Sequence, residues 1–228
     1  MCYSKNMMKK ILIPLITVTI ISTAFTSCKE KYSLIEENRS DSIVQAKIVF
    51  PEYKKYPDLN EKIRSFIDDD LENYKNECEQ FWNAGSQYPY SYRTTFEDKS
   101  NSDYINCFIS KYIFSGISTE TEYFFTFVYN KKTRKIETIE NVSEKSLKEI
   151  AKLCEEDIKK QVQKETGEKV DPFIEDWIKT GTSPRDINYT AWTASKNVIT
   201  VYFKTGQVLT KYFGSRKVTI PLKQESRR

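Results

Sequence analysis

Residues 104–129 read YINCFISKYIFSGISTETEYFFTFVY, and this stretch decides the fold class. It holds two dense apolar runs, Tyr104–Phe114 and residues 122–129. Both runs have the length of strands and the weak alternation that is typical of strands covered on both faces. Residues 130–134 then predict a polar turn, and residues 135–139 a returning strand. We therefore predict that this stretch forms the centre of a β-sheet.

The residues before this stretch alternate between aromatic or β-branched side chains and polar ones. The members of one face are Tyr88, Tyr90, Tyr92, Thr94 and Phe96. A period of two is typical of a half-buried strand. Further upstream, residues 42–50 (SIVQAKIVF) predict a first strand, which ends at Pro51 because proline cannot donate to the ladder.

A long helix is predicted between these two strands. It opens at Pro57, with Asp58 as its cap and Glu61 in a variant of the capping box. Its apolar stripe consists of Leu59, Ile63, Phe66, Ile67, Leu71, Tyr74, Cys78 and Phe81. Three acids at residues 68–70 lie between stripe positions and point about 100° apart, so they cannot converge on one metal ion. We interpret them as a solvated acidic face.

Two more helices and four strands are predicted after the sheet centre. One helix begins at Ser143 and ends at Gly167, because glycine tolerates the left-handed conformation of a helix C-cap. The next begins at Asp171, with proline in its first turn, and ends at Gly181. The four strands are residues 187–194, 198–203, 208–213 and 217–222.

The order of elements is β-α-β-β-β followed by α-α-β-β-β-β. It predicts an α+β protein with two packed halves, each a mainly antiparallel sheet with helices on one face. We assign residues 1–27 to a signal peptide, 28–42 to a tether, 43–140 to the first half, 141–222 to the second half and 223–228 to a tail.

The N-terminal residues have the parts of an export signal. Two lysines at residues 9–10 precede an apolar run over residues 11–25, and small residues precede Cys28. Residues 25–28 (FTSC) resemble a bacterial lipobox, in which the cysteine becomes the lipidated first residue. We expect a lipoprotein of the cell envelope, anchored to the membrane through Cys28; simple secretion and an uncleaved anchor remain alternatives. The true start is Met1, Met7 or Met8.

Composition excludes several classes of function. The chain has 228 residues and no histidine, so Ser-His-Asp, Cys-His and His-ligated zinc sites cannot form. Its six glycines do not make a nucleotide-binding loop. Without the leader lysines, 33 basic and 32 acidic residues remain, so we expect no nucleic-acid partner. We also expect no metal and no cofactor.

Three cysteines follow Cys28, at positions 78, 107 and 154, without the C-x-x-C spacing of redox or metal sites. Cys78 and Cys154 lie on the apolar stripes of predicted helices, where a free thiol behaves as a small apolar side chain. Two possibilities remain open: all three cysteines are buried free thiols, or two of them form a disulfide and the third is free.

With these elements placed, residues 43–222 resemble the RsiV-like exported domains, the extracellular parts of lysozyme-sensing anti-sigma factors and accessory modules of some peptidoglycan deacetylases. The matching segments are Tyr56-Pro57-Asp58-Leu59-Asn60 with Ile63, Ile109-Ser110 with Tyr112, residues 125–130, Tyr202-Phe203, Val208, Tyr212, Gly214 and residues 218–222. The resemblance implies a binding module without catalytic activity, whose ligand is a protein or a cell-wall component, with lysozyme and peptidoglycan as candidates.

The residues suggest one binding surface and one alternative function. Tyr88, Tyr90 and Tyr92 are the candidate ligand-binding face, because tyrosine is a frequent interface anchor; the other interpretation is that their rings face a helix. The three tryptophans, Trp82, Trp177 and Trp192, fit core positions better than a sugar platform. The alternative function is a glycan hydrolase that uses two carboxylates, with candidates Glu97, Asp98, Asp103, Glu120 and Glu122.

Overall fold

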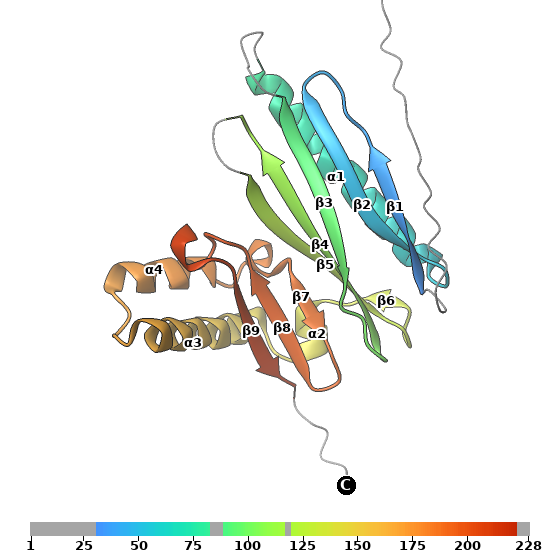
Figure 1. The fold of residues 1–228 in the computed structure, drawn as a ribbon. Coiled ribbons are helices and arrows are strands. Elements are labelled where there is room, and N and C mark those ends of the chain that lie inside the picture. Colours follow the sequence, from blue (N-terminus) through green and yellow to red (C-terminus); the bar gives the residue numbers. More distant parts are fainter. Residues whose placement is uncertain (1–30, 83–88, 117–119, 223–228) are drawn as a thin grey trace, which may run out of the picture.

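The structure is a computed structural model that describes residues 31–82, 89–116 and 120–222. Its first half is a six-stranded sheet in the order β1-β2-β3-β4-β5-β6, with one long helix, α1, on one face (Figure 1). The strands are β1 (Tyr32–Asn38), β2 (Val44–Tyr53), β3 (Tyr90–Asp98), β4 (Tyr104–Phe114), β5 (Thr121–Asn130) and β6 (Lys135–Ile136). The predicted pairing of residues 104–114 with the following run is confirmed as the β4–β5 pair, but β5 lies near the edge of the sheet, because β6 pairs with only its last two residues.

Helix α1 (Pro57–Phe81) connects β2 to β3, the one parallel pair of this sheet. A parallel pair requires a crossover, and the helix supplies it. The predicted stripe faces the sheet from Leu59 to Cys78, whereas Phe81 at the end of the helix is 73% exposed. The predicted cap is wrong: Tyr56 takes the N-cap position, and Asp58 instead accepts a hydrogen bond of 2.7 Å from Tyr129 Oη.

Strand β1 lies in the segment that we assigned to the tether. It pairs antiparallel with β2 along its whole length, from Tyr32 opposite Tyr53 to Asn38 opposite Lys47. An edge strand needs apolar side chains on one face only, and the rings of Tyr32 and Phe96 meet at 5.2 Å on that face. The polar composition of this segment therefore suits an edge strand as well as a tether.

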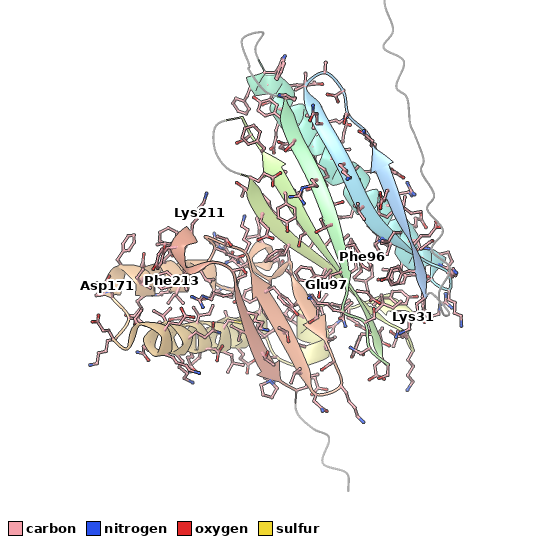
Figure 2. All side chains as sticks on the ribbon, viewed as in Figure 1. Lys31, Phe96, Glu97, Asp171, Lys211 and Phe213 are labelled. Atoms are coloured by element: carbon pink, nitrogen blue, oxygen red, sulfur yellow. The ribbon has the colours of Figure 1, made fainter. Side chains whose placement is uncertain are left out.

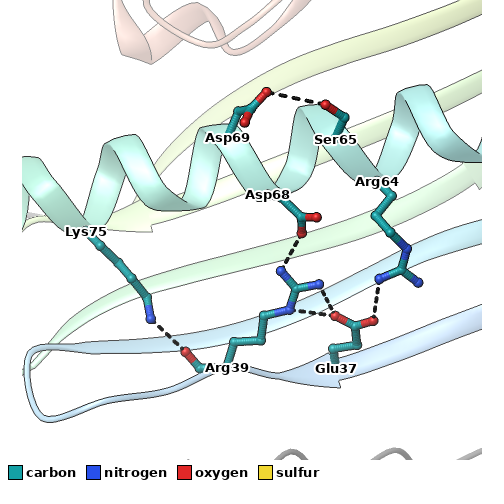
Figure 3. A network of polar contacts seen from close by, with 7 residues as sticks. All are labelled: Glu37, Arg39, Arg64, Ser65, Asp68, Asp69 and Lys75. Atoms are coloured by element: carbon teal, nitrogen blue, oxygen red, sulfur yellow. Dashed lines mark hydrogen bonds and ion pairs between the residues drawn. The ribbon is translucent and has the colours of Figure 1, made fainter.

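Ion pairs fix the turn after β1 to helix α1 (Figure 3). Arg39 contacts Glu37 on β1 and donates from Nη1 to Asp68 Oδ1 on the helix at 2.5 Å. Arg64, one turn before Asp68, donates to the other oxygen of Glu37 at 3.1 Å. These contacts attach the edge strand to the helix that covers the sheet.

The second half consists of three helices and a three-stranded antiparallel sheet in the order β7-β8-β9. Its elements are α2 (Ile139–Ser143), α3 (Leu147–Thr166), α4 (Pro172–Gly181), the 3-10 helices η1 (Asp186–Tyr189) and η2 (Lys211–Phe213), and strands β7 (Trp192–Ala194), β8 (Val198–Phe203) and β9 (Arg216–Pro221). Helix α3 packs against β9 and α4, so helices cover one face of this sheet as well. The α+β class and its two halves are confirmed.

The helix boundaries of this half follow local capping chemistry. The predicted start at Ser143 is wrong: Ser143 is the last residue of α2, and the chain turns at Glu144. Helix α3 begins at Leu147, after Ser146, which forms a capping box with Glu149. The predicted stop at Gly167 is confirmed, with a left-handed φ of 73°. Asp171 caps α4 as predicted, accepting a hydrogen bond from the Phe173 amide at 2.8 Å.

Two of the four predicted strands in this half are wrong in extent or kind. Only Trp192–Ala194 is a strand within residues 187–194, because residues 186–189 turn into η1. Residues 208–213 form no strand: Val208 and Leu209 are neighbours and both buried, whereas strand neighbours point to opposite faces. The segment packs so closely on Gly181 that a Cβ there would lie 2.1 Å from the Gln207 carbonyl oxygen.

Among the helices of the described chain, none has the length and apolar content that crossing a membrane requires. The expected signal peptide, the lipidation site Cys28 and the tail at 223–228 lie outside the described residues.

Candidate functional site

The predicted tyrosine face belongs to the core of the first half. Tyr92 is 1% exposed and Tyr90 is 8% exposed, and both side chains lie under α1. The Tyr92 ring lies 5.8 Å from that of Tyr74 on the helix, and the Tyr90 ring lies 5.9 Å from that of Trp82. The binding surface proposed for Tyr90 and Tyr92 is therefore wrong. Tyr88, its third member, lies outside the described residues.

The last of the three acids at residues 68–70 also turns toward this core. Asp70 accepts hydrogen bonds of 2.8 Å from Tyr92 Oη and from the Lys111 ammonium. The side chain of Lys111 is 11% exposed and lies 4.9 Å from the Tyr123 ring. The interpretation as a wholly solvated acidic face is therefore wrong for Asp70, which balances a mostly buried cation.

The opposite face of the six-stranded sheet meets the second half. Asn106 on β4 both accepts from the Ala194 amide and donates to the Ala194 carbonyl, at 2.9 Å each. Thr126 on β5 donates from its amide to the Thr190 carbonyl at 3.1 Å, and its hydroxyl accepts from the Trp192 amide. These bonds tie β7 to β4 and β5 and hold the two sheets in one arrangement.

Beside this junction, the two sheets enclose a cleft of about 400 Å³. It is lined by Glu97, Lys99, Phe108, Ser110, Phe124, Tyr202, Ser215, Arg216 and Lys217. The first five come from β3, β4, β5 and the turn after β3, and the other four from β8, β9 and the turn before β9. Glu97 marks its position in Figure 2, where it lies between the sheet of the first half and the second half. This volume is in the range of small-ligand sites in proteins.

Aromatic rings form the floor of the cleft. Phe108 lies 5.3 Å from Phe124 and 4.9 Å from Tyr202, so one buried ring connects the two sheets. The Lys99 ammonium lies 4.8 Å from the centre of the Phe108 ring and 2.6 Å from Glu97 Oε1. The floor is thus apolar and the rim is charged, which is the usual composition of a ligand site.

Arg216 is held in place by a bidentate ion pair. Its Nη1 and Nη2 donate to the two carboxylate oxygens of Glu165 on α3 at 2.5 and 2.7 Å. These hydrogen bonds lower the pKa of Glu165 and keep it ionised. The neighbouring Lys217 is exposed and has no ion pair within the described part of the chain.

The acids considered for hydrolysis do not gather in this cleft. Glu97 is its one carboxylate, and the described structure pairs it with Lys99. Asp98 accepts from the Ser100 amide, and Asp103 accepts from the Ser102 hydroxyl in the exposed turn. Glu120 pairs with Arg93 at 3.0 Å. Glu122 stands opposite Tyr112 in the β4–β5 register.

The tryptophans and thiols occupy mainly structural positions. Trp192 is 6% exposed and belongs to the core of the second half, and Trp82 packs on the core of the first. Trp177 contacts the exposed Phe173 ring at 5.9 Å on α4. Cys78, Cys107 and Cys154 are free and buried, which decides the question of a disulfide among them. Within the described ranges, no three metal-binding side chains converge on one point.

Sequence reasoning did not identify the cleft. Phe108 lies inside a continuous apolar run, and Tyr202 belongs to a strand in the other half, so neither stands out locally. The one available signal is the β4 register, which places Phe108 on the face opposite to its neighbour Ile109. That signal becomes useful only when the packing of the second half is known.

Comparison with known proteins gives a family similarity in the second half. Residues 137–223 match the model of the family described as "Protein of unknown function (DUF3298)". Among curated proteins, the search finds no match.

Two solved structures share the fold over most of the chain. A DUF3298 family protein from Pseudomonas aeruginosa PAO1 aligns with a TM-score of 0.56 at 11% identity, covering 91% of each chain. A DUF3298 family member from Bacteroides fragilis NCTC 9343 aligns with a TM-score of 0.52 at 12% identity, covering 83% of this chain and 89% of the other. The chain is thus similar to the DUF3298 family in sequence over its second half and shares the fold of these two members.

Proposed function

We propose that this chain is an exported, membrane-anchored binding protein without catalytic activity, and that its ligand is a protein or a cell-wall component bound in the cleft between the two halves. The observation that carries the proposal is the cleft itself, with an aromatic floor, a charged rim and walls from both sheets. The lipobox-like sequence before Cys28 supports anchoring, and the RsiV-like resemblance supports lysozyme and peptidoglycan as the first ligands to test.

The composition of the cleft favours binding over hydrolysis. A glycosidase of the common type needs two carboxyl groups about 5–10 Å apart. The residues that line the cleft include a single carboxylate, Glu97, which forms an ion pair with Lys99 at 2.6 Å. The cleft therefore lacks the second carboxyl group that the common glycosidase mechanisms require.

Retention on purified sacculi and on immobilised lysozyme tests the proposal, with the full-length protein in mild detergent. We expect the wild-type chain to be retained on one of these two supports without releasing soluble glycan fragments, measured by chromatography. Phe124→Ala should abolish retention, because it removes one ring from the cleft floor. Phe173→Ala removes a 66% exposed ring on α4 outside the cleft and should leave retention unchanged.

The outcomes separate the two functions. Release of glycan fragments by the wild-type chain, lost in Glu97→Gln, would establish the hydrolase instead. Equal retention of Phe124→Ala and the wild type would show that binding does not use the cleft. Retention of the wild type on neither support would overturn the proposed ligands.

A further inference from the structure

The charges around the cleft are unequal. Three cations, Lys99, Arg216 and Lys217, line it together with one carboxylate, Glu97. Two of the cations already have a carboxylate partner, since Lys99 pairs with Glu97 and Arg216 pairs with Glu165. Lys217 is the remaining cation, and the described structure gives it no ion pair. The cleft therefore carries an uncompensated positive charge that favours an anionic group on the ligand.

Arg216 adds a second polar feature to the same wall. Its Nε is buried and has no hydrogen-bond partner among the described residues, although both terminal nitrogens are bonded to Glu165. The guanidinium is directed toward α3, so it adds positive charge to this wall but offers no accessible donor to the cleft. Ser215 precedes Arg216 and lines the same cleft.

The floor of the cleft offers flat apolar surface. Phe124 and Tyr202 are partly exposed, and each packs against the buried Phe108 ring, which holds both in place. Rigid rings present large apolar area at low conformational cost and suit the flat C–H face of a sugar ring. Ser110 and Ser215 also line the cleft, and serine hydroxyls can bond sugar hydroxyls.

We propose that the cleft binds a saccharide that carries a carboxylate. The carboxylate lies toward the Lys217 ammonium, and the sugar ring packs on Phe124 and Tyr202. The volume of about 400 Å³ suits a short part of a glycan rather than a folded domain. This inference rests on the proposed binding function and specifies the ligand class of the same site.

A pair of sugars that differ only in the acid tests the inference. We would titrate full-length protein in mild detergent with the N-acetylglucosaminyl–N-acetylmuramic acid disaccharide and with diacetylchitobiose, which lacks the lactyl carboxylate. We expect the acidic sugar to bind at least about tenfold more tightly, since a charge-assisted hydrogen bond has that effect on a dissociation constant. Its affinity should fall as salt concentration rises.

Two lysine variants locate the effect. Lys217→Gln should weaken the affinity for the acidic sugar about tenfold. It should leave the affinity for the neutral sugar unchanged. Lys160→Gln removes an exposed lysine of α3 outside the cleft and should change neither affinity. Both lysines are exposed, so both variants should keep the wild-type thermal transition.

Equal binding of the two sugars, binding of neither sugar, or displacement by an acidic peptide at lower concentration than by the acidic sugar would each overturn this ligand class. In all three cases the proposed function stands if Phe124→Ala still abolishes retention on sacculi or lysozyme. Loss of the carboxylate preference in Lys217→Gln, with Lys160→Gln unaffected, would support the inference.

Discussion

The two faces of the six-stranded sheet both carry aromatic side chains but differ in what covers them. On one face, Tyr92 and its neighbours lie under α1 and are almost fully buried. On the other, Phe108 and Phe124 meet the second half, which crosses only part of the sheet and leaves the cleft beside the junction. The same residue types thus form a core on one face and a candidate binding floor on the other.

Charged residues show the same contrast. The Asp70–Lys111 pair lies under α1, with side chains that are 22% and 11% exposed. The Arg93–Glu120 pair lies on the opposite face, with side chains that are 38% and 44% exposed. Composition alone therefore does not tell which face serves packing and which serves binding; the cover on each face does.

The largest expected effect comes from truncating one ring on each face. Tyr92→Ala should lower the free energy of unfolding by about 3–5 kcal/mol, because it opens a cavity under α1 and leaves Asp70 without one donor. Phe124→Ala should lower it by only about 1 kcal/mol, because that ring is partly exposed. Urea denaturation followed by circular dichroism measures both values. Similar losses for the two variants would contradict the contrast between the faces.

The parts of the fold that depend on local patterns could be predicted. Helix α1 has its stripe at helical spacing, and the β4–β5 pair has long apolar runs with a polar turn after them. Gly167 and Asp171 end and begin helices through chemistry of a few neighbouring residues. In each case the deciding interactions lie within one element or one turn.

The parts that depend on distant contacts could not. Strand β1 is polar on its outer side and is defined by pairing with β2, so its sequence is equally typical of a tether. Val208 and Leu209 are apolar because they fill the core beside Gly181. Their apolar character alone suggests a strand, which the structure does not form there. The cleft requires Phe108 and Tyr202 from different halves, and the burial of Tyr90 and Tyr92 depends on the position of α1.

A smaller effect is expected from removing one cation on each face. Lys111→Met leaves the Asp70 carboxylate mostly buried without its cation, which should cost about 2 kcal/mol, less than for a fully buried pair because Asp70 keeps some solvent contact. Arg93→Met breaks an exposed pair and should cost less than about 0.5 kcal/mol. Denaturation midpoints of the two variants give the comparison. Adding Asp70→Asn to Lys111→Met should restore part of the lost stability; a further loss would show that the charge pair is not the cause.

The smallest expected effect concerns the sheet face of the second half that its helices cover. It is the change in stability with pH that the Cys154 thiol causes. Burial raises the pKa of Cys154 to about 12, above the value of an exposed thiol. Above pH 9 the unfolded chain therefore loses this proton while the folded chain keeps it, so the stability that the neutral thiol contributes is complete below that pH and is lost as pH rises toward 12. Between pH 9 and pH 10, Cys154 alone should lower the free energy of unfolding by about 1 kcal/mol. Cys154→Ala should be less stable at pH 8 but should lose less stability over this interval than the wild type, measured by urea denaturation at each pH. An equal loss in both proteins would mean that Cys154 does not titrate differently in the folded and unfolded states, and that the helices of the second half do not shield their sheet face as α1 shields that of the first.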